Sequence, residues 1–230
     1  MKRIFILISF FCLVGVANVS FAQEVKINHT TTGDHIGGLA IEADGTIRLD
    51  GAATVFDDMF ADITKVKVQG TGLTINDAEL TIDFSSSADL LDYATVVYQM
   101  SHKWKAESAI SPHFHWIQES ANVPNFLIQY RWQRNGGAKT TAWTNYKCNT
   151  SNAFTYSTGS LNQITFGTTG ITPPAGYSIS DVIQVRILRD TKNDSGLFSG
   201  ADPYTGTAAV SSVDCHYEID TDGSRSVITK

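Results

Sequence analysis

The sequence has little charge, little proline and almost no cysteine, and these shortages exclude several classes of protein. Charged residues make up 17% of the 230 residues, while hydrophobic residues make up 42%. About a quarter of a soluble domain is usually charged, and a disordered acidic chain has the opposite balance. Five prolines and 18 glycines exclude a collagen-like or low-complexity chain. The formal net charge of −6, with no basic stripe, argues against nucleic acid as a partner.

Long apolar runs are also missing, except for one at the N-terminus. Residues 4–17 are apolar and follow a short basic start, and Ser20 and Ala22 place small side chains at a cleavage site. The run is shorter than the roughly 20 residues of a membrane span, so the layout predicts a secretory signal peptide over 1–22. An N-terminal anchor is the alternative. Without the leader, 15 basic and 23 acidic residues give a net charge of −8.

Two cysteines lie beyond the leader, which is too few for a disulfide framework. Cys148 and Cys215 each fall in a strand-like run. They could pair in an oxidising compartment or remain buried free thiols, and the sequence leaves both open.

The rest of the chain alternates between apolar and polar residues almost throughout. Asp44-Gly45 separates two alternating segments and predicts a hairpin, because a type I′ turn needs positive φ at both central residues. Further alternating segments lie at 63–69, 73–84, 93–104, 112–119, 126–134, 141–148, 154–156, 162–166, 182–189 and 213–220. Only residues 53–61 could form a short helix. The pattern predicts an all-β protein, an antiparallel β-sandwich or jelly roll over 61–230, with an N-terminal hairpin arm over 23–60.

Strand parity assigns side chains to faces. In the last segment Asp214, His216, Glu218 and Asp220 should face outward, and Val213, Cys215, Tyr217 and Ile219 inward. The outward faces of the predicted strands are rich in Thr, Ser, Gln and Asn rather than Lys and Glu. Such faces suit burial against another copy of the chain, so we expect self-association.

The most informative constellation for chemistry is a pair of histidines. His113 and His115 point the same way on a strand, and Glu119 has the same parity. Two imidazoles and a carboxylate suit a divalent metal, with His216 as a further candidate ligand. Polar surface histidines without metal are the alternative interpretation.

Two more specific metal sites are compatible with this pair. The spacing His-x-His-x-x-x-Glu matches the first half of a cupin metal motif. Two features depart from that motif: Glu107 and Phe126 stand where a cupin would have glycine, and the second half of the motif, with its own histidine, does not follow at the usual distance along the chain. Alternatively, three chains could each donate His113 and His115 to one metal on a symmetry axis.

Other acidic residues give weaker signals. Asp190, Asp194 and Asp202 flank a loop and could hold calcium. They lack the usual Asp-x-Asp-x-Asp-Gly spacing, and this lack favours a solvated loop.

The common enzyme motifs do not occur in the sequence. The chain has no Gly-x-Ser-x-Gly elbow, no phosphate-binding glycine loop followed by lysine and no His-Glu-x-x-His.

Several short motifs occur in a distinctive order. They are Gln99-Met-Ser-His-Lys-Trp-Lys105, Ile110-Ser-Pro-His-Phe-His-Trp116, Ile187-Leu-Arg-Asp190, Asp214-Cys-His-Tyr217, Asp220 and Gly223-Ser224. In this order they resemble an uncharacterised family of tailed-bacteriophage virion proteins, over residues 95–230. Residues 38–58 resemble the glycine-hairpin arms of phage fibre proteins. Phage structural proteins seldom carry signal peptides, so the leader departs from this pattern; a secreted bacterial relative would explain it.

Two hypotheses follow. The resemblance implies a non-catalytic, homotrimeric, fibre- or decoration-like subunit of a phage virion or another extracellular assembly. Candidate contacts for glycans or neighbouring chains are then Tyr98, Trp104, Trp132, Trp143 and Tyr146, with ordinary sheet core as the alternative for each aromatic. The second hypothesis is a secreted jelly-roll enzyme that depends on a metal, or a glycan-binding module. The position of His216 relative to His113 and His115 should discriminate between assembly and catalysis.

Overall fold

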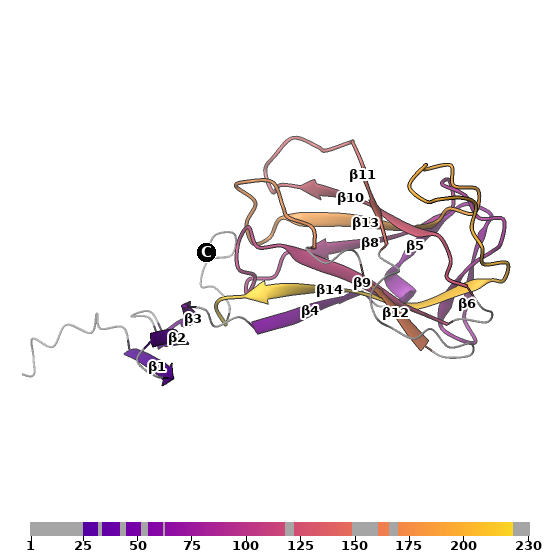
Figure 1. Ribbon diagram of the computed structural model, residues 1–230. Coiled ribbons are helices and arrows are strands. Elements are labelled where there is room, and N and C mark those ends of the chain that lie inside the picture. The colour runs from indigo at the N-terminus through magenta and orange to yellow at the C-terminus, as the bar shows by residue number, and fades with distance from the viewer. Residues whose placement is uncertain are drawn as a thin grey trace, which may run out of the picture. The chain divides into compact units, whose positions relative to one another are not determined.

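The computed structural model describes residues 25–31, 34–41, 45–51, 55–61, 63–117, 122–148, 161–165 and 170–222 (Figure 1). The predicted leader, Glu119 and the predicted strand at 154–156 lie outside these ranges. Within them, no helix is long and apolar enough to cross a membrane. The chain divides into two compact units, with the division between Ala53 and Thr54.

The first unit contains a three-stranded antiparallel sheet in the order β1-β2-β3. Its strands are β1 (Val25–Thr31), β2 (Asp34–Ile41) and β3 (Ile47–Gly51). The predicted hairpin around Asp44-Gly45 is confirmed, because Ile41 of β2 pairs with Ile47 of β3. Gly45 has φ of +86°, in the left-handed region that glycine adopts readily. The register is not that of the predicted two-residue turn at Asp44-Gly45, which would pair Ile41 with Arg48.

The second unit is a sandwich of two antiparallel sheets, which confirms the predicted fold class (Figure 1). One sheet has the order β11 (Thr144–Lys147), β10 (Phe126–Gln133), β13 (Val182–Arg189), β8 (Tyr93–Gln99) and β5 (Lys67–Gln69). The other has the order β12 (Leu161–Thr165), β9 (Ile110–Ile117), β14 (Ala208–Ile219), β7 (Thr81–Phe84) and β6 (Leu73–Asn76), and β4 (Val55–Ala61) also pairs with β14. A single 3₁₀ turn, η1 (Ile63–Lys65), precedes β5.

The core lies between the two sheets and follows the predicted parity. Phe114 of β9 and Phe126 of β10 are fully buried, and their rings meet edge-on with centroids 4.8 Å apart. On β14, Val213, Cys215 and Tyr217 are buried as expected. Burial of such large aromatic and aliphatic side chains is the main force that holds the sheets together.

The part of the predicted helical segment that the structure describes, residues 55–61, is a strand and does not belong to the arm. It forms β4, whose seven residues pair antiparallel with β14 from Val213 to Ile219. The six-stranded sheet therefore begins at β4, and the predicted arm boundary at residue 60 falls within this strand. Backbone pairing with β14 outweighs the weak local preference for a helical turn. On the outer side of β4, Phe56 and Phe60 are each 64% exposed.

Both cysteines are free and buried, which settles the alternative left open by the sequence. Cys215 faces the core from β14, and Cys148 follows β11. Burial raises the pKa of both thiols well above the ordinary value, so both remain protonated.

Arg189, at the end of β13, is fully buried and anchors the loop that follows it. Its Nε donates to Oδ2 of Asp202 at 2.7 Å. Nη1 donates to the backbone carbonyls of Phe84 at 3.0 Å and Gly206 at 2.7 Å, and Nη2 donates to the carbonyl of Tyr204. The arginine in the Ile187–Asp190 motif therefore ties both sheets to the 190–206 loop.

Candidate functional site

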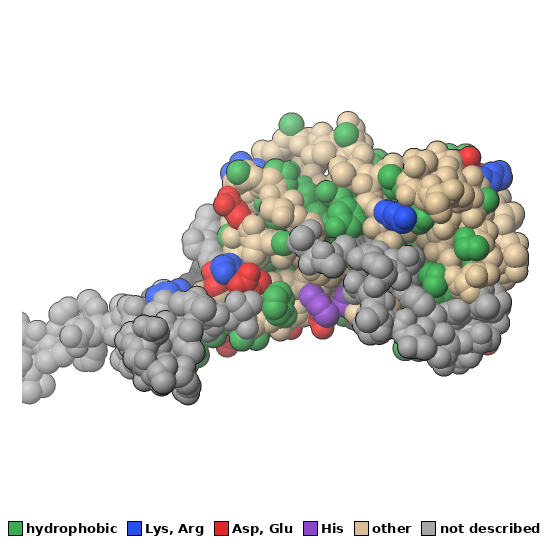
Figure 2. Space-filling view, viewed as in Figure 1, with side chains coloured by type: hydrophobic (Ala, Val, Ile, Leu, Met, Phe, Trp, Pro, Cys, Tyr) green, Lys and Arg blue, Asp and Glu red, His purple; other side chains and the backbone are tan. Residues whose placement is uncertain are grey.

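The two histidines of the sequence motif lie on the outer face of the six-stranded sheet. Phe114 and Trp116, which alternate with them on β9, are buried in the core. His113 and His115 therefore project away from the sandwich interior. Histidine side chains reach the surface of the second unit beside acidic side chains (Figure 2).

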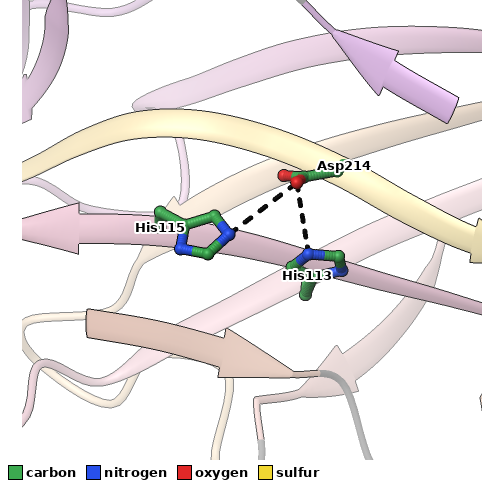
Figure 3. Close-up of side chains that lie close together, drawn as sticks. All are labelled: His113, His115 and Asp214. Carbon is green, nitrogen blue, oxygen red and sulfur yellow. Dashed lines mark ion pairs between the residues drawn. The ribbon is translucent and has the colours of Figure 1, made fainter. Parts of the chain in front are cut away.

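The neighbouring strand supplies the carboxylate. In the antiparallel pairing of β9 with β14, Asp214 stands directly opposite His113. Side chains at such paired positions lie on the same face, with Cβ atoms about 4.5–5.5 Å apart. Figure 3 shows both imidazoles directed toward Asp214.

Three side chains thus bring their ligand atoms together. Nε2 of His113 lies 3.2 Å from Oδ2 of Asp214, and Nε2 of His115 lies 3.7 Å from the same oxygen. All three ligand atoms lie within 4.8 Å of one another. His113 is only 3% exposed, and the side chains of His115 and Asp214 are 27% and 15% exposed. Within the described ranges, this is the one cluster of three or more such side chains with metal-ligand spacing.

His216 lies on the same face but engages a different carboxylate. Its ring centroid is 4.3 Å from that of His113, yet its Nε2 lies 2.9 Å from Oδ1 of Asp58 on β4. Both members of that pair are about half exposed, at 44% and 52%. The histidine is therefore a neighbour of the cluster rather than one of its three converging groups. Glu119, the carboxylate expected from the sequence, lies outside the described residues, so its predicted role stays a prediction.

Burial of the cluster favours neutral imidazole at His115. Desolvation is the largest effect and lowers the pKa of His115, while Asp214 opposes this shift and the neighbouring histidines reinforce it. A neutral imidazole has a lone pair available for a metal or a hydrogen-bond donor. Two buried polar atoms, Nδ1 of His113 and Oδ1 of Asp214, have no hydrogen-bond partner among the residues described.

Three of the five aromatic side chains considered as contacts from the sequence, Tyr98, Trp104 and Trp132, are buried, so the sheet-core alternative holds for them. Trp104 is 0% exposed and Trp132 is 4% exposed, and their rings stack on each other in the core with centroids 6.3 Å apart. Tyr98 is equally buried. Tyr146 is half-buried and packs against the core, with its ring 6.5 Å from that of Tyr130.

Trp143 is different, because it lies over the outer face of the five-stranded sheet. The guanidinium carbon of Arg131 is 4.3 Å from its ring centroid, and that of Arg186 is 3.9 Å away. Arg186 also stacks on Tyr93 at 3.9 Å. Both guanidinium groups are attracted to the negative faces of these rings.

Amide side chains hold this stack in place. Nε of Arg131 donates to Gln184 at 2.6 Å, and Nη1 of Arg186 donates to Gln129 at 3.4 Å. Gln129 in turn donates to Asn145 at 3.1 Å. We call the seven residues Tyr93, Gln129, Arg131, Trp143, Asn145, Gln184 and Arg186 the Trp143 platform. It combines aromatic faces with pre-oriented hydrogen-bonding groups on one flat sheet surface.

Two of the three loop aspartates considered for calcium, Asp190 and Asp202, have protein partners for their carboxylates. The carboxylate of Asp190 accepts the backbone N–H groups of Asp194 at 2.8 Å and Ser195 at 3.0 Å. Asp202 is paired with Arg189. These carboxylate oxygens stabilise the loop. Arg189 and Asp190 of the Ile187–Asp190 motif therefore each have a structural role: Arg189 pairs with Asp202, and Asp190 accepts backbone N–H groups of the loop.

Comparison with known proteins names no family. No protein-family model matches the chain, and no curated protein matches it. Among solved structures, a carbohydrate-binding module with specific mannan recognition is similar at 11% identity and a TM-score of 0.37, over 72% of this chain and 99% of that one. The enzymatically active domain of tailspike protein 4 of bacteriophage CBA120 is similar at 12% identity and a TM-score of 0.32, over 72% of this chain and 19% of that one. Neither similarity is close enough to assign a function.

Proposed function

We propose that the chain is a non-catalytic, glycan-binding β-sandwich that serves as a fibre- or decoration-like subunit of a phage virion or another extracellular assembly. The observation that carries the glycan-binding part is the Trp143 platform. Sugar rings present C–H groups on their faces and hydroxyls at their rims. They can therefore stack on an indole, while amides and guanidinium groups hydrogen-bond to the hydroxyls.

The platform is suited to this task because its groups are already ordered. Arg131 and Arg186 are fixed by hydrogen bonds to glutamines before any ligand arrives. Binding then loses little side-chain entropy, which would otherwise reduce affinity by about 0.5–1.5 kcal/mol for each immobilised long side chain. Trp143 is half-buried, so part of its surface remains open to solvent.

The experiment is a binding screen against soluble polysaccharides by affinity gel electrophoresis, followed by titration of the strongest ligand. We expect Trp143→Ala to weaken binding at least about 10-fold, because truncated aromatic anchors typically contribute 2 kcal/mol or more. Trp143→Tyr should retain most of the affinity. Ile75→Ala, which truncates a 50% exposed side chain on β6 of the other sheet, is the control and should bind as the wild type does. Equal binding by Trp143→Ala would refute the platform as the glycan site.

The assembly part rests on other features. The motif resemblance to phage virion proteins supports it, and so do the exposed Phe56 and Phe60 at the edge of the six-stranded sheet. We propose a homotrimer that is exported by the N-terminal leader. Light scattering of the purified chain measures the mass directly, and a monomer would rule out the trimer. Mass spectrometry of the exported protein identifies its first residue; an intact leader would overturn the predicted cleavage.

A metal-dependent enzyme is the second candidate, and the cluster of His113, His115 and Asp214 favours it. Catalytic metal sites commonly combine three protein ligands with one open position. Incubation of each bound polysaccharide with the wild type and with Asp214→Asn distinguishes the two functions. Depolymerisation by the wild type alone would establish an enzyme and refute the non-catalytic proposal.

A further inference from the structure

The cluster on β9 and β14 has no role in the Trp143 platform, which lies on the other sheet. We propose that Nε2 of His113, Nε2 of His115 and the carboxylate of Asp214 bind one divalent transition-metal ion of the zinc type. Such an ion would join β9 to β14 within a single chain. This inference goes beyond glycan binding and does not depend on it.

The spacing of the ligand atoms fits a metal. Zinc binds nitrogen and oxygen at about 2.0–2.2 Å, so neighbouring ligand atoms of a tetrahedral site lie about 3.4 Å apart. The two separations from Oδ2 of Asp214, 3.2 Å to His113 and 3.7 Å to His115, bracket that value. The ligand atoms of the two histidines lie within 4.8 Å of each other, so a side-chain adjustment would place all three groups around one ion.

A purely hydrogen-bonded cluster explains the geometry less well. The 3.7 Å separation of His115 from Asp214 is too long for a hydrogen bond. Oδ1 of Asp214 is buried, and none of the described residues offers it a hydrogen bond. A buried carboxylate oxygen without a partner is unfavourable, and bidentate coordination, with Oδ1 joining Oδ2 on the same cation, would satisfy it. The contact geometry therefore favours a ligand between the three side chains.

The donor types select the kind of metal. Two imidazoles and one carboxylate suit zinc, iron, nickel or copper, whereas calcium and magnesium prefer shells of oxygen alone. The nearest additional imidazole, His216, has its Nε2 occupied by Asp58 at 2.9 Å. A water molecule would then complete a four-coordinate site, as in other sites with three protein ligands.

The ligand set also determines the stoichiometry. Asp214 lies in the same chain as the histidines, and His113 is only 3% exposed. A buried imidazole cannot reach a symmetry axis shared with other chains. We therefore expect one metal ion per chain, whereas the axial arrangement considered from the sequence requires one ion per three chains.

The experiment is calorimetric titration of the metal-free full chain with ZnCl₂, with CaCl₂ as the comparison cation. We expect one Zn²⁺ per chain and no binding of Ca²⁺ at the same concentrations. Asp214→Asn and His115→Ala should each weaken Zn²⁺ binding at least about 10-fold, because even residues that only support a ligand contribute that much. His216→Gln is the matched control on the same face and should stay within about threefold of the wild type.

The controls separate loss of the site from loss of the fold. Circular dichroism and the melting temperature without metal should be the same for the control and for Asp214→Asn, which is nearly isosteric. Absence of Zn²⁺ binding to the wild type, or equal binding by Asp214→Asn and His115→Ala, would overturn the proposal. A ratio of one Zn²⁺ to three chains would also overturn it, in favour of an axial ion. Failure of glycan binding leaves each of these outcomes unchanged.

Discussion

Replacing Arg189 by methionine should destabilise the sandwich strongly, because this guanidinium is the most heavily bonded buried charge described. It is 0% exposed and pairs with Asp202, whose side chain is 1% exposed. It also donates to three backbone carbonyls, those of Phe84, Tyr204 and Gly206. Methionine fills a similar volume but leaves the carboxylate and the carbonyls without their donor.

The magnitude follows from these contacts. Removing one partner of a buried ion pair typically destabilises a protein by about 3–5 kcal/mol, since the other charge stays buried and unpaired. The second unit spans residues 54–230, or 177 residues. For a unit of this size, 1 kcal/mol shifts the melting temperature by about 2–4 °C. We therefore expect Arg189→Met to lower it by roughly 6–20 °C, a large part of a typical stability of about 5–15 kcal/mol.

The assays are thermal unfolding, for the melting temperature, and urea unfolding, for the free energy, both followed by circular dichroism. Arg134→Met is the control because Arg134 is exposed. The control should change stability by less than about 0.5 kcal/mol. Adding Asp202→Asn to Arg189→Met removes the unpaired charge and should recover about 1–3 kcal/mol. A loss below about 1 kcal/mol for the single variant, or a double variant less stable than the single one, would refute the reasoning.

The remaining predictions concern the thiols, one glycine and one surface ion pair. Cys148 and Cys215 should not react with a thiol reagent in the native protein, because both are buried with raised pKa values, and should react once urea unfolds the chain; rapid native labelling at either position, mapped by mass spectrometry, would contradict their burial. Gly70→Ala should lower the free energy of unfolding in urea by about 2 kcal/mol or more, because Gly70 has φ of +101° and a Cβ there would overlap Asp92. A loss below about 0.5 kcal/mol would count against that overlap. Lys105→Ala breaks the ion pair with Glu218, whose lysine is 49% exposed, and should change the free energy of unfolding by less than about 1 kcal/mol because solvent screens the pair. A larger loss would show that solvent does not screen it.

Most strands were predictable because period-two alternation is a local property. His113 and His115 share a face by parity alone, and the outward position of Asp214 on its strand was also predicted correctly. What the sequence could not show was the register that places Asp214 opposite His113, because the pairing joins segments about a hundred residues apart. The local pattern therefore favoured Glu119 as the carboxylate.

Most of the errors also come from contacts between segments that are distant in sequence. Residues 53–61 look locally like a short helix, and only the pairing with β14 makes residues 55–61 a strand. Trp132 has the parity of the buried Ile128, so its burial could have been predicted. Trp104 follows β8 and is buried through contacts that no local pattern reveals. Trp143 precedes its strand, and the arginines beneath it come from β10 and β13.

The position of β14 in the six-stranded sheet has a consequence for synthesis. Val55 of β4 pairs with Ile219 of β14, so 164 residues (219 minus 55) separate the two partners. At about 5–20 residues per second, a ribosome needs roughly 8–30 s to make that interval. During this time the backbone N–H and C=O groups of β4 lack their partners on β14, whereas Phe56 and Phe60 are exposed in the finished fold as well. We expect β4 to need a chaperone while the nascent chain grows, since an unpaired strand edge can pair with other chains and closure of such a long loop is slow.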